Sequence, residues 1–237
     1  MNGHVTLSGK KISVVRSLRL MVAGAIFVAG VPMLMAQAPG GAPGAGPRQA
    51  PPPPPPPTAG AHLEIMDGSS ASYRVTEQFV GISFPNDAIG TTPTVAGVLT
   101  IAADGSVAPG SKLTIDLRNL KSDQDQRDGY VKNRLLETDK FPMAEFVPTK
   151  IQGLPALIPT AGQAGIQLTG NLTIHGVTKE VTFSGITTFN PRESTAAGRA
   201  KTTFAFATFG LTKPTIARLM SVDDKIELEI MFRFKRS

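Results

Sequence analysis

The chain has 237 residues, no cysteine and a formal net charge of +6. Without cysteine it has no disulfide, no thiolate zinc site and no N-terminal cysteine for lipid attachment. Residues 1–60 have five basic and no acidic side chains, so the other 177 residues are nearly balanced, with 19 basic and 18 acidic. A balanced domain with few aromatic residues gives no support for nucleic-acid binding.

The N-terminal segment, residues 1–38, has the pattern of a signal peptide. Four basic residues precede an apolar run from Leu20 to Ala36, and small residues stand at Ala36 and Ala38, where a signal peptidase would cut. We therefore expect export to the periplasm. The run is about 17 residues long, the lower limit for crossing a bilayer, so an uncleaved leader that contacts the membrane as an anchor is the alternative.

A linker is expected over residues 39–62, which are rich in proline and glycine and include seven consecutive prolines, Pro51–Pro57. Such a segment buries little apolar surface and has few backbone donors, so it should form an extended polyproline II spacer. Recognition of the proline run by a partner is the alternative. The composition favours a stiff tether between leader and domain.

One folded domain is expected over residues 63–237, where short alternating segments are separated by Gly, Pro, Asn and Asp. Near the C-terminus, for example, Ile226 and Leu228 alternate with Lys225 and Glu227. Alternation of this kind predicts antiparallel sheet with one apolar face, in a closed barrel or in a two-sheet sandwich. The expected strands are residues 72–76, 80–84, 95–102, 112–120, 144–152, 167–175, 180–190, 200–209 and 225–234, which merge to about eight.

Two short helices are expected among the strands. Residues 122–136 begin with Ser122 and acidic side chains, which suit the N-terminal end of a helix. Residues 214–220 begin with Pro214, which suits a first helical turn. Each helix would either cover one end of a barrel as a lid or seal a packed core as a plug.

Residues that could bind a metal or act in catalysis are few. The three histidines, His4, His62 and His175, are far apart in the chain, so we expect no metal site, no cofactor and no enzyme activity. His175 lies in a hairpin over residues 170–184 and is expected to be a turn residue. An enzyme that acts on a lipid with His175 as its catalytic base is the weakest alternative.

An acidic cluster precedes the expected first helix. Asp123, Asp125 and Asp128 resemble the start of a calcium loop, but the glycine and the distal glutamate of an EF-hand are missing at their positions. We expect a solvated helix start instead. Arg127 and Asp128 stand beside Tyr130 just after a strand, where they would either bind a polar head group or hold the helix to the sheet by hydrogen bonds.

Three segments of the domain resemble the YceI-like family of exported, lipocalin-like polyisoprenoid-binding barrels. They are QRDGYVKNRLLETDKFPMAEF (residues 126–146), GNLTIHGVTKEVTF (170–183), and FATFGL (206–211) followed by VDDKIELEI (222–230). Their order and spacing fit the family over most of the domain. Tyr130 departs from the family pattern, because members commonly have a histidine after the Arg-Asp pair, and the first hairpin, residues 81–98, is short and contains proline.

The resemblance implies an all-β, eight-stranded antiparallel lipocalin-like barrel with one or two short helices. It implies that an apolar tunnel holds an isoprenoid or a similar long-chain amphiphile, for transport, storage or stress protection. The side chains expected to line the tunnel are Leu113, Ile115, Leu117, Leu172, Ile174, Val181, Phe183, Phe204, Phe206, Ile226, Leu228, Ile230 and Phe232. Arg127, Asp128 and Tyr130 are expected at its polar mouth. A filled barrel that acts as a cell-envelope interaction module without a small ligand is the alternative.

Overall fold

The computed structural model describes residues 60–237 except residues 82, 156 and 216–218. The expected signal peptide and nearly all of the expected linker lie outside the described residues. Within the described part of the chain, no helix is both long and apolar enough to cross a membrane. The first strand begins at Ala61, two residues before the expected start of the folded domain.

The described residues form mostly strands, with a few short helical segments. The strands are β1 (Ala61–Ile65), β2 (Ser70–Phe79), β3 (Asn86–Thr92), β4 (Val95–Ile101), β5 (Lys112–Asp116), β6 (Met143–Gln152), β7 (Gly162–Ile174), β8 (Val177–Asn190), β9 (Thr195–Phe204), β10 (Leu219–Val222) and β11 (Ile226–Arg236). The helical segments are the 3-10 helices η1 (Leu117–Asn119) and η3 (Phe206–Phe209), the α-helix α1 (Asp125–Tyr130) and the π-helical turn η2 (Val131–Leu135).

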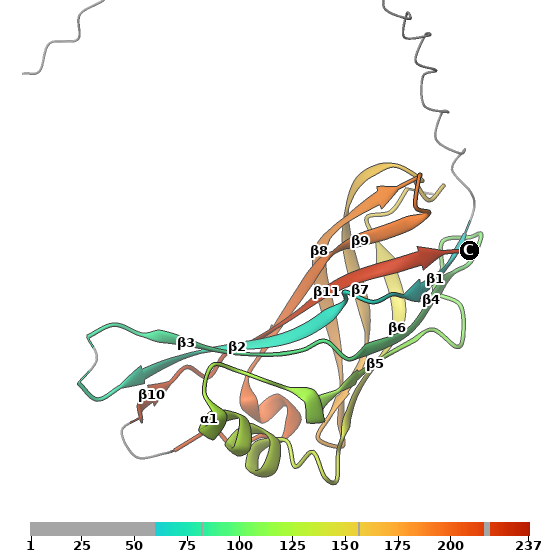
Figure 1. Cartoon of the computed structure of the whole chain (residues 1–237). Coiled ribbons are helices and arrows are strands. Elements are labelled where there is room, and N and C mark those ends of the chain that lie inside the picture. The colour runs from blue at the N-terminus through green and yellow to red at the C-terminus, as the bar shows by residue number, and fades with distance from the viewer. Residues whose placement is uncertain (1–59, 82, 156, 216–218) are drawn as a thin grey trace, which may run out of the picture. The chain divides into compact units, whose positions relative to one another are not determined.

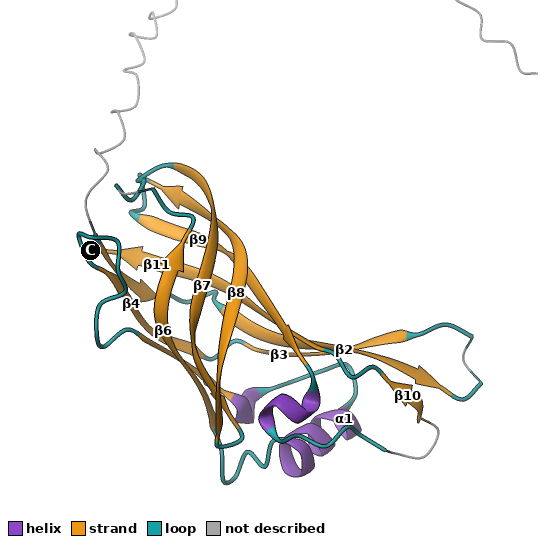
Figure 2. Cartoon of the chain, turned by 180° about the vertical axis from the view of Figure 1, so that it is seen from behind, coloured by secondary structure: helices purple, strands orange, loops and turns teal. Residues whose placement is uncertain are grey.

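Eight of these strands close into a barrel (Figures 1 and 2). Their order is β1, β4, β5, β6, β7, β8, β9 and β11, each pair is antiparallel, and β11 pairs with β1 to complete the ring. Closure pairs every strand on both sides and leaves one face of the sheet inside. The expected antiparallel barrel is confirmed, and the sandwich alternative is wrong.

Strand β11 changes partner along its length. It pairs with β1 at residues 234–236 and with β2 at residues 227–231. Ser69 stabilises the turn that separates β1 from β2. Its hydroxyl donates a hydrogen bond to the Met66 carbonyl (2.8 Å) and accepts one from the Arg233 amide of β11 (3.0 Å). Beyond this break, β2 continues with β3 and β10 as an arm that extends past the ring (Figure 1).

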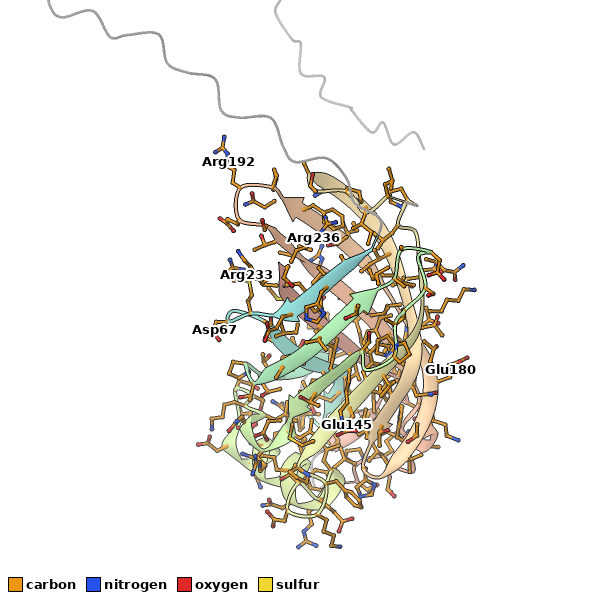
Figure 3. All side chains as sticks on the ribbon, turned by 90° about the vertical axis from the view of Figure 1, so that its right-hand side faces the viewer. Asp67, Glu145, Glu180, Arg192, Arg233 and Arg236 are labelled. Carbon is orange, nitrogen blue, oxygen red and sulfur yellow. The ribbon has the colours of Figure 1, made fainter. Side chains whose placement is uncertain are left out.

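The alternation seen in the sequence separates the inside of the barrel from its outside. In β11, Ile226 and Phe232 are buried, whereas Met231 between the two faces outward and is 52% exposed. Charged side chains such as Glu145 and Glu180 point away from the wall (Figure 3). The interior is therefore apolar, and the outer face of the barrel is polar.

The prediction of a strand at residues 80–84 is wrong. The described residues of this range, 80, 81, 83 and 84, lie in turns and bends between β2 and β3, where Val80 and Phe84 are 64% and 79% exposed. The missed strand follows as β3, whose sequence Asn-Asp-Ala-Ile-Gly-Thr-Thr has residues that disfavour strands. Pairing with β2 along its whole length stabilises β3 in spite of this composition.

Two other expected strands end earlier than predicted. The first ends at Asp116, whose carboxylate accepts a hydrogen bond from the Arg118 amide (2.9 Å) and starts helix η1. The second ends at Phe204, after which η3 carries the chain to Phe209. In both cases the apolar alternation continues into a 3-10 helix, which the period of the side chains alone does not distinguish from a strand.

The first expected helix is confirmed, because α1 and η2 lie within residues 122–136. The second, over residues 214–220, is wrong where the structure describes it. Leu219 and Met220 belong to strand β10, which pairs with the edge of β2. Residues 216–218 lie outside the described residues.

Candidate functional site

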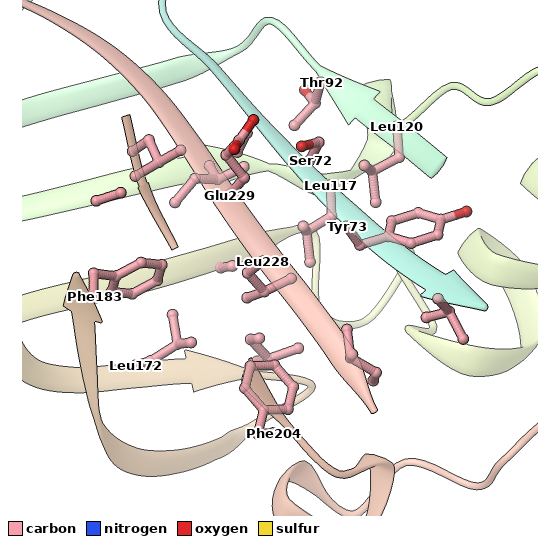
Figure 4. Close-up of a pocket in the computed structure, with 18 of the residues that line it drawn as sticks. Ser72, Tyr73, Thr92, Leu117, Leu120, Leu172, Phe183, Phe204, Leu228 and Glu229 are labelled. Atoms are coloured by element: carbon pink, nitrogen blue, oxygen red, sulfur yellow. The ribbon is translucent and has the colours of Figure 1, made fainter. Parts of the chain in front are cut away.

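The barrel encloses a cavity of about 1240 Å³ with mainly apolar walls. Figure 4 shows part of this wall, with Leu172, Phe183, Phe204 and Leu228 on separate strands around the same space. Side chains packed at the barrel axis would leave no cavity of this size. The filled-barrel alternative therefore does not describe this chain.

Twelve of the thirteen side chains predicted to line a tunnel do line this cavity. They are Leu113, Ile115, Leu117, Leu172, Ile174, Phe183, Phe204, Phe206, Ile226, Leu228, Ile230 and Phe232. Val181 instead packs half-buried against the core outside the cavity lining. The Phe146 ring lies against Gly170, the β7 partner of Val181, and forms this part of the wall. That these side chains contact a ligand stays a prediction.

Most of the polar side chains that line the cavity come from β2, β3 and the segment around α1. We call this group the polar end of the cavity. Its members are Ser72, Tyr73, Glu77, Asn86, Thr92, Asp123, Gln124, Gln126, Arg127 and Tyr130. Arg127 and Tyr130 thus lie at the cavity as predicted, whereas Tyr73 and Glu77 were not predicted from the sequence.

Arg127 is paired on both sides within the polar end. Its Nη2 donates to Glu77 Oε1 at 2.5 Å, and its Nη1 donates to the Asp123 carboxylate. Burial lowers the pKa of Arg127, but the hydrogen bonds to Glu77 and Asp123 outweigh it, and the pKa is raised. Glu77 lies at an inward position of β2, between Val75 and Phe79. A carboxylate at an inward position of an apolar alternation is the sequence feature from which Glu77 could have been predicted as a cavity residue.

Asp128 does not line the cavity, because its carboxylate is turned towards the chain that precedes α1. It accepts hydrogen bonds from the Ser122 amide (2.8 Å) and hydroxyl (2.6 Å), and Lys121 Nζ lies 3.2 Å from its Oδ2. Burial raises the pKa of Asp128, but these hydrogen bonds outweigh burial and lower it. Lys121 and Thr91 exchange backbone hydrogen bonds, so Asp128 helps to fix α1 beside β3. Its role is structural.

Tyr73 brings a phenol to the polar end. It lies opposite Gly90 in the β2–β3 register, and a Cβ atom at position 90 would lie 2.2 Å from Tyr73 Cε1. The absent side chain of Gly90 therefore gives the ring its place against β3. A tyrosine hydroxyl is protonated at neutral pH and can donate a hydrogen bond, and burial raises the pKa of Tyr73 further, to about 12.

His175 is a turn residue, as predicted. His175 and Gly176 form the two-residue connection between β7 and β8, with φ angles of 51° and 73°. Positive φ at both positions is typical of a type I′ hairpin turn. The imidazole Nε2 lies 2.9 Å from Glu137 Oε2, and the ring packs edge-on against Phe141. His175 is not among the described residues that line the cavity.

A closed eight-stranded antiparallel barrel around an apolar cavity is a lipocalin-like barrel. The chain belongs to the YceI-like domain family, whose model matches residues 66–234. This confirms the resemblance seen in the sequence. A UPF0312 protein of Pseudomonas putida strain W619 is 32% identical over 134 residues, which cover 52% of this chain and 65% of that protein. A UPF0312 protein of Pseudomonas fluorescens strain SBW25 is 34% identical over 139 residues, covering 55% and 67%.

Two solved structures share the fold at low sequence identity. A polyisoprenoid binding domain from Saccharophagus degradans has a TM-score of 0.56 and 14% identity, covering 76% of this chain and 99% of that domain. Burkholderia cenocepacia BcnA has a TM-score of 0.51 and 20% identity, covering 70% of this chain and 95% of that protein. The likeness extends over nearly the whole of both neighbours.

Proposed function

We propose that this protein is an exported binding protein that holds one isoprenoid or similar long-chain amphiphile in its barrel, for transport, storage or protection under stress. The observation that carries the proposal is the apolar cavity of about 1240 Å³ with polar groups gathered at one end. Pockets for small molecules typically have about 300–1,000 Å³, so this cavity has room for a longer chain. Transfer of each CH₂ group from water to an apolar wall stabilises a complex by about 0.8 kcal/mol.

The comparisons support this assignment at the level of ligand class. The Saccharophagus degradans neighbour is a polyisoprenoid binding domain with the same fold. The cavity wall of the present chain is built from aliphatic and phenyl side chains, which suit a methyl-branched hydrocarbon. Binding of such a chain needs burial and shape, and no reacting group.

The decisive experiment is ligand recovery from the full chain. We expect native mass spectrometry and organic extraction to show one bound lipid-like molecule per protein, or uptake of one molecule of added geranylgeraniol. Ala200 lines the cavity and is 3% exposed, so Ala200→Phe should occupy part of the space and reduce uptake. Thr203→Phe places the same ring on the exposed face of the same strand and should leave uptake unchanged.

Two results would argue against the proposal. One is a folded protein that carries no apolar molecule and takes up none. The other is equal uptake by the Ala200→Phe and Thr203→Phe variants, because binding would then lie outside the barrel. Export is tested separately, by the N-terminal sequence of the protein recovered from the periplasmic fraction, which should start near residue 37 or 39.

A further inference from the structure

The arm formed by β2, β3 and β10 ends in exposed apolar side chains. Val80 and Phe84, in the connection between β2 and β3, are 64% and 79% exposed, and Met220 of β10 is 62% exposed. Met220 belongs to the same end of the arm, because its neighbour Leu219 lies opposite Phe79 in the β10–β2 register. The arm extends past the ring of the barrel (Figure 1), so these side chains lie at its free end. We call Val80, Phe84 and Met220 the arm tip.

The sequence of the β2–β3 connection has no charge. No Asp, Glu, Lys or Arg stands from residue 78 to residue 86. The next charged residues on β2 and β3 are already paired, since Glu77 accepts a hydrogen bond from Arg127 and Asp87 accepts one from Arg74 at 2.6 Å. A charged side chain is costly to place in a bilayer, and this connection has none that would have to enter one.

The cavity reaches the surface of the protein beside the arm tip. Val80 and Phe84 both line the cavity, although each is more than half exposed. Phe79 and Leu219 at the same end of the arm line it as well. The apolar wall of the cavity is thus continuous with the arm tip. A hydrocarbon chain that enters or leaves the barrel here stays in contact with apolar side chains.

A lipid bilayer fits the arm tip better than a protein partner does. A stable protein–protein interface takes about 800 Å² and roughly 20–30 residues from each partner. The described residues of the arm tip offer three side chains at the end of a hairpin, which is too few for such an interface. Insertion into the boundary between lipid head groups and acyl chains needs only apolar area to bury, and aromatic side chains such as Phe84 provide much of it.

We infer that the arm tip is a docking site for the surface of a lipid bilayer, into which Val80, Phe84 and Met220 insert. The contact is apolar, so it requires no anionic lipid. Docking places the opening beside the arm tip against the membrane, while the polar outer face of the barrel stays in water. The inference goes beyond the proposed function, because it concerns where the protein meets a membrane rather than what the barrel holds.

A tryptophan at the arm tip tests the insertion. The chain has no tryptophan, so a single one reports on one place in the full chain. Vesicles of brominated phosphatidylcholine should quench the Phe84→Trp variant at least about twofold more than unbrominated vesicles do, because the indole enters the lipid. Met231→Trp is the matched control and should show little quenching, because Met231 is 52% exposed on the barrel wall, opposite Arg199. Both variants have the same N-terminal segment, so any contact that this segment makes with vesicles is common to them.

Lipid that entered the barrel could also quench a tryptophan at position 84, because Phe84 lines the cavity. The Ala200→Phe substitution separates the two sources, since it occupies part of the cavity and leaves the arm tip unchanged. Quenching of Phe84→Trp should persist in this background if the bilayer is its source. Loss of the quenching there would contradict docking.

A charge at the arm tip tests docking by its effect on transfer. Met220 does not line the cavity, and Met220→Glu should slow the transfer of geranylgeraniol from phosphatidylcholine vesicles by about fivefold or more, because a carboxylate disfavours insertion. Uptake of geranylgeraniol added in ethanol should stay within about twofold. Met231→Glu makes the same change on the barrel wall and should alter neither measurement.

Two results would overturn the inference. One is equal quenching of the Phe84→Trp and Met231→Trp variants, which would favour a protein partner at the arm tip. The other is an equal rate of transfer to the Met220→Glu and Met231→Glu variants. Failure of the unmodified protein to take up geranylgeraniol from either source would instead contradict the proposed function, and the quenching experiment would still decide whether the arm tip docks.

Discussion

Arg127 Nη2 lies 2.5 Å from Glu77 Oε1, although 50 residues separate the two in the chain. The pair attaches α1 to β2 at the polar end of the cavity. Both side chains are largely buried, at 14% and 10% exposure, so the contact is shielded from solvent. This pair therefore helps to hold the helix over this end of the cavity, together with the contacts of Asp128.

Removing either partner of this pair should destabilise the protein. Arg127→Met leaves Glu77 as a buried charge with no guanidinium beside it, and we expect the free energy of unfolding to fall by about 3 kcal/mol. The double variant Arg127→Met/Glu77→Met should lose much less than the sum of the two single variants, because it leaves no uncompensated charge. Urea unfolding of all four proteins measures the coupling. Additive losses would show that the two side chains do not act as a pair.

The place of the Tyr73 ring depends on the missing side chain of Gly90. Gly90→Ala would bring a Cβ atom to 2.2 Å from Tyr73 Cε1, so the ring must move, and we expect a loss of about 1–3 kcal/mol in the free energy of unfolding. In the background of Tyr73→Leu the same alanine should cost clearly less, since the ring is gone. An equal loss in both backgrounds, measured by urea unfolding, would point to β3 backbone effects instead.

The β7–β8 turn needs glycine at its second position. Gly176 has a φ of 73°, and a Cβ atom there would lie 2.8 Å from Phe141 Cε1, so both the backbone and the packing disfavour alanine. Gly176→Ala should lower the free energy of unfolding by about 1–2 kcal/mol, with a matching fall in melting temperature. Gly165→Ala in β7 is the control, because nothing lies within 4 Å of its Cβ position, and it should be neutral or slightly stabilising. Equal effects at both glycines would contradict this account.

Acid should weaken the protein partly through Asp128. The pKa of Asp128 is lower in the folded protein than its value of about 3.9 in an unfolded chain. The unfolded state therefore binds the proton first as pH falls, so the stabilisation is complete above about pH 4 and is lost as pH falls through the folded pKa. Asp128→Asn should be less stable at pH 7 but lose less stability on acidification, measured by urea unfolding at several pH values. A variant that follows the same pH profile as the unmodified protein would exclude Asp128 as a source of the acid sensitivity.

Local alternation in the sequence was sufficient for much of the wall. In β11, apolar residues at every second position predicted both the strand and its inward face, and Ile226, Leu228 and Phe232 line the cavity. The hairpin from Gly170 to Ser184 was predicted in the same way, including His175 at the turn. These features depend on a side-chain period of two and on turn geometry, which act over a few neighbouring residues.

Only the tertiary structure decided how the barrel closes and which charges meet at its polar end. Strand β3 has a composition that disfavours strands and exists because it pairs along β2. The pairing of β11 with β1, and of Arg127 with Glu77, joins residues that are far apart in the chain. These pairings are stabilised by hydrogen bonds and charge contacts between residues that meet only in the folded protein. No short stretch of sequence therefore predicts them. The sequence by itself therefore determined an apolar inner face, and the closed ring decided that this face surrounds a cavity whose polar end pairs Arg127 with two carboxylates.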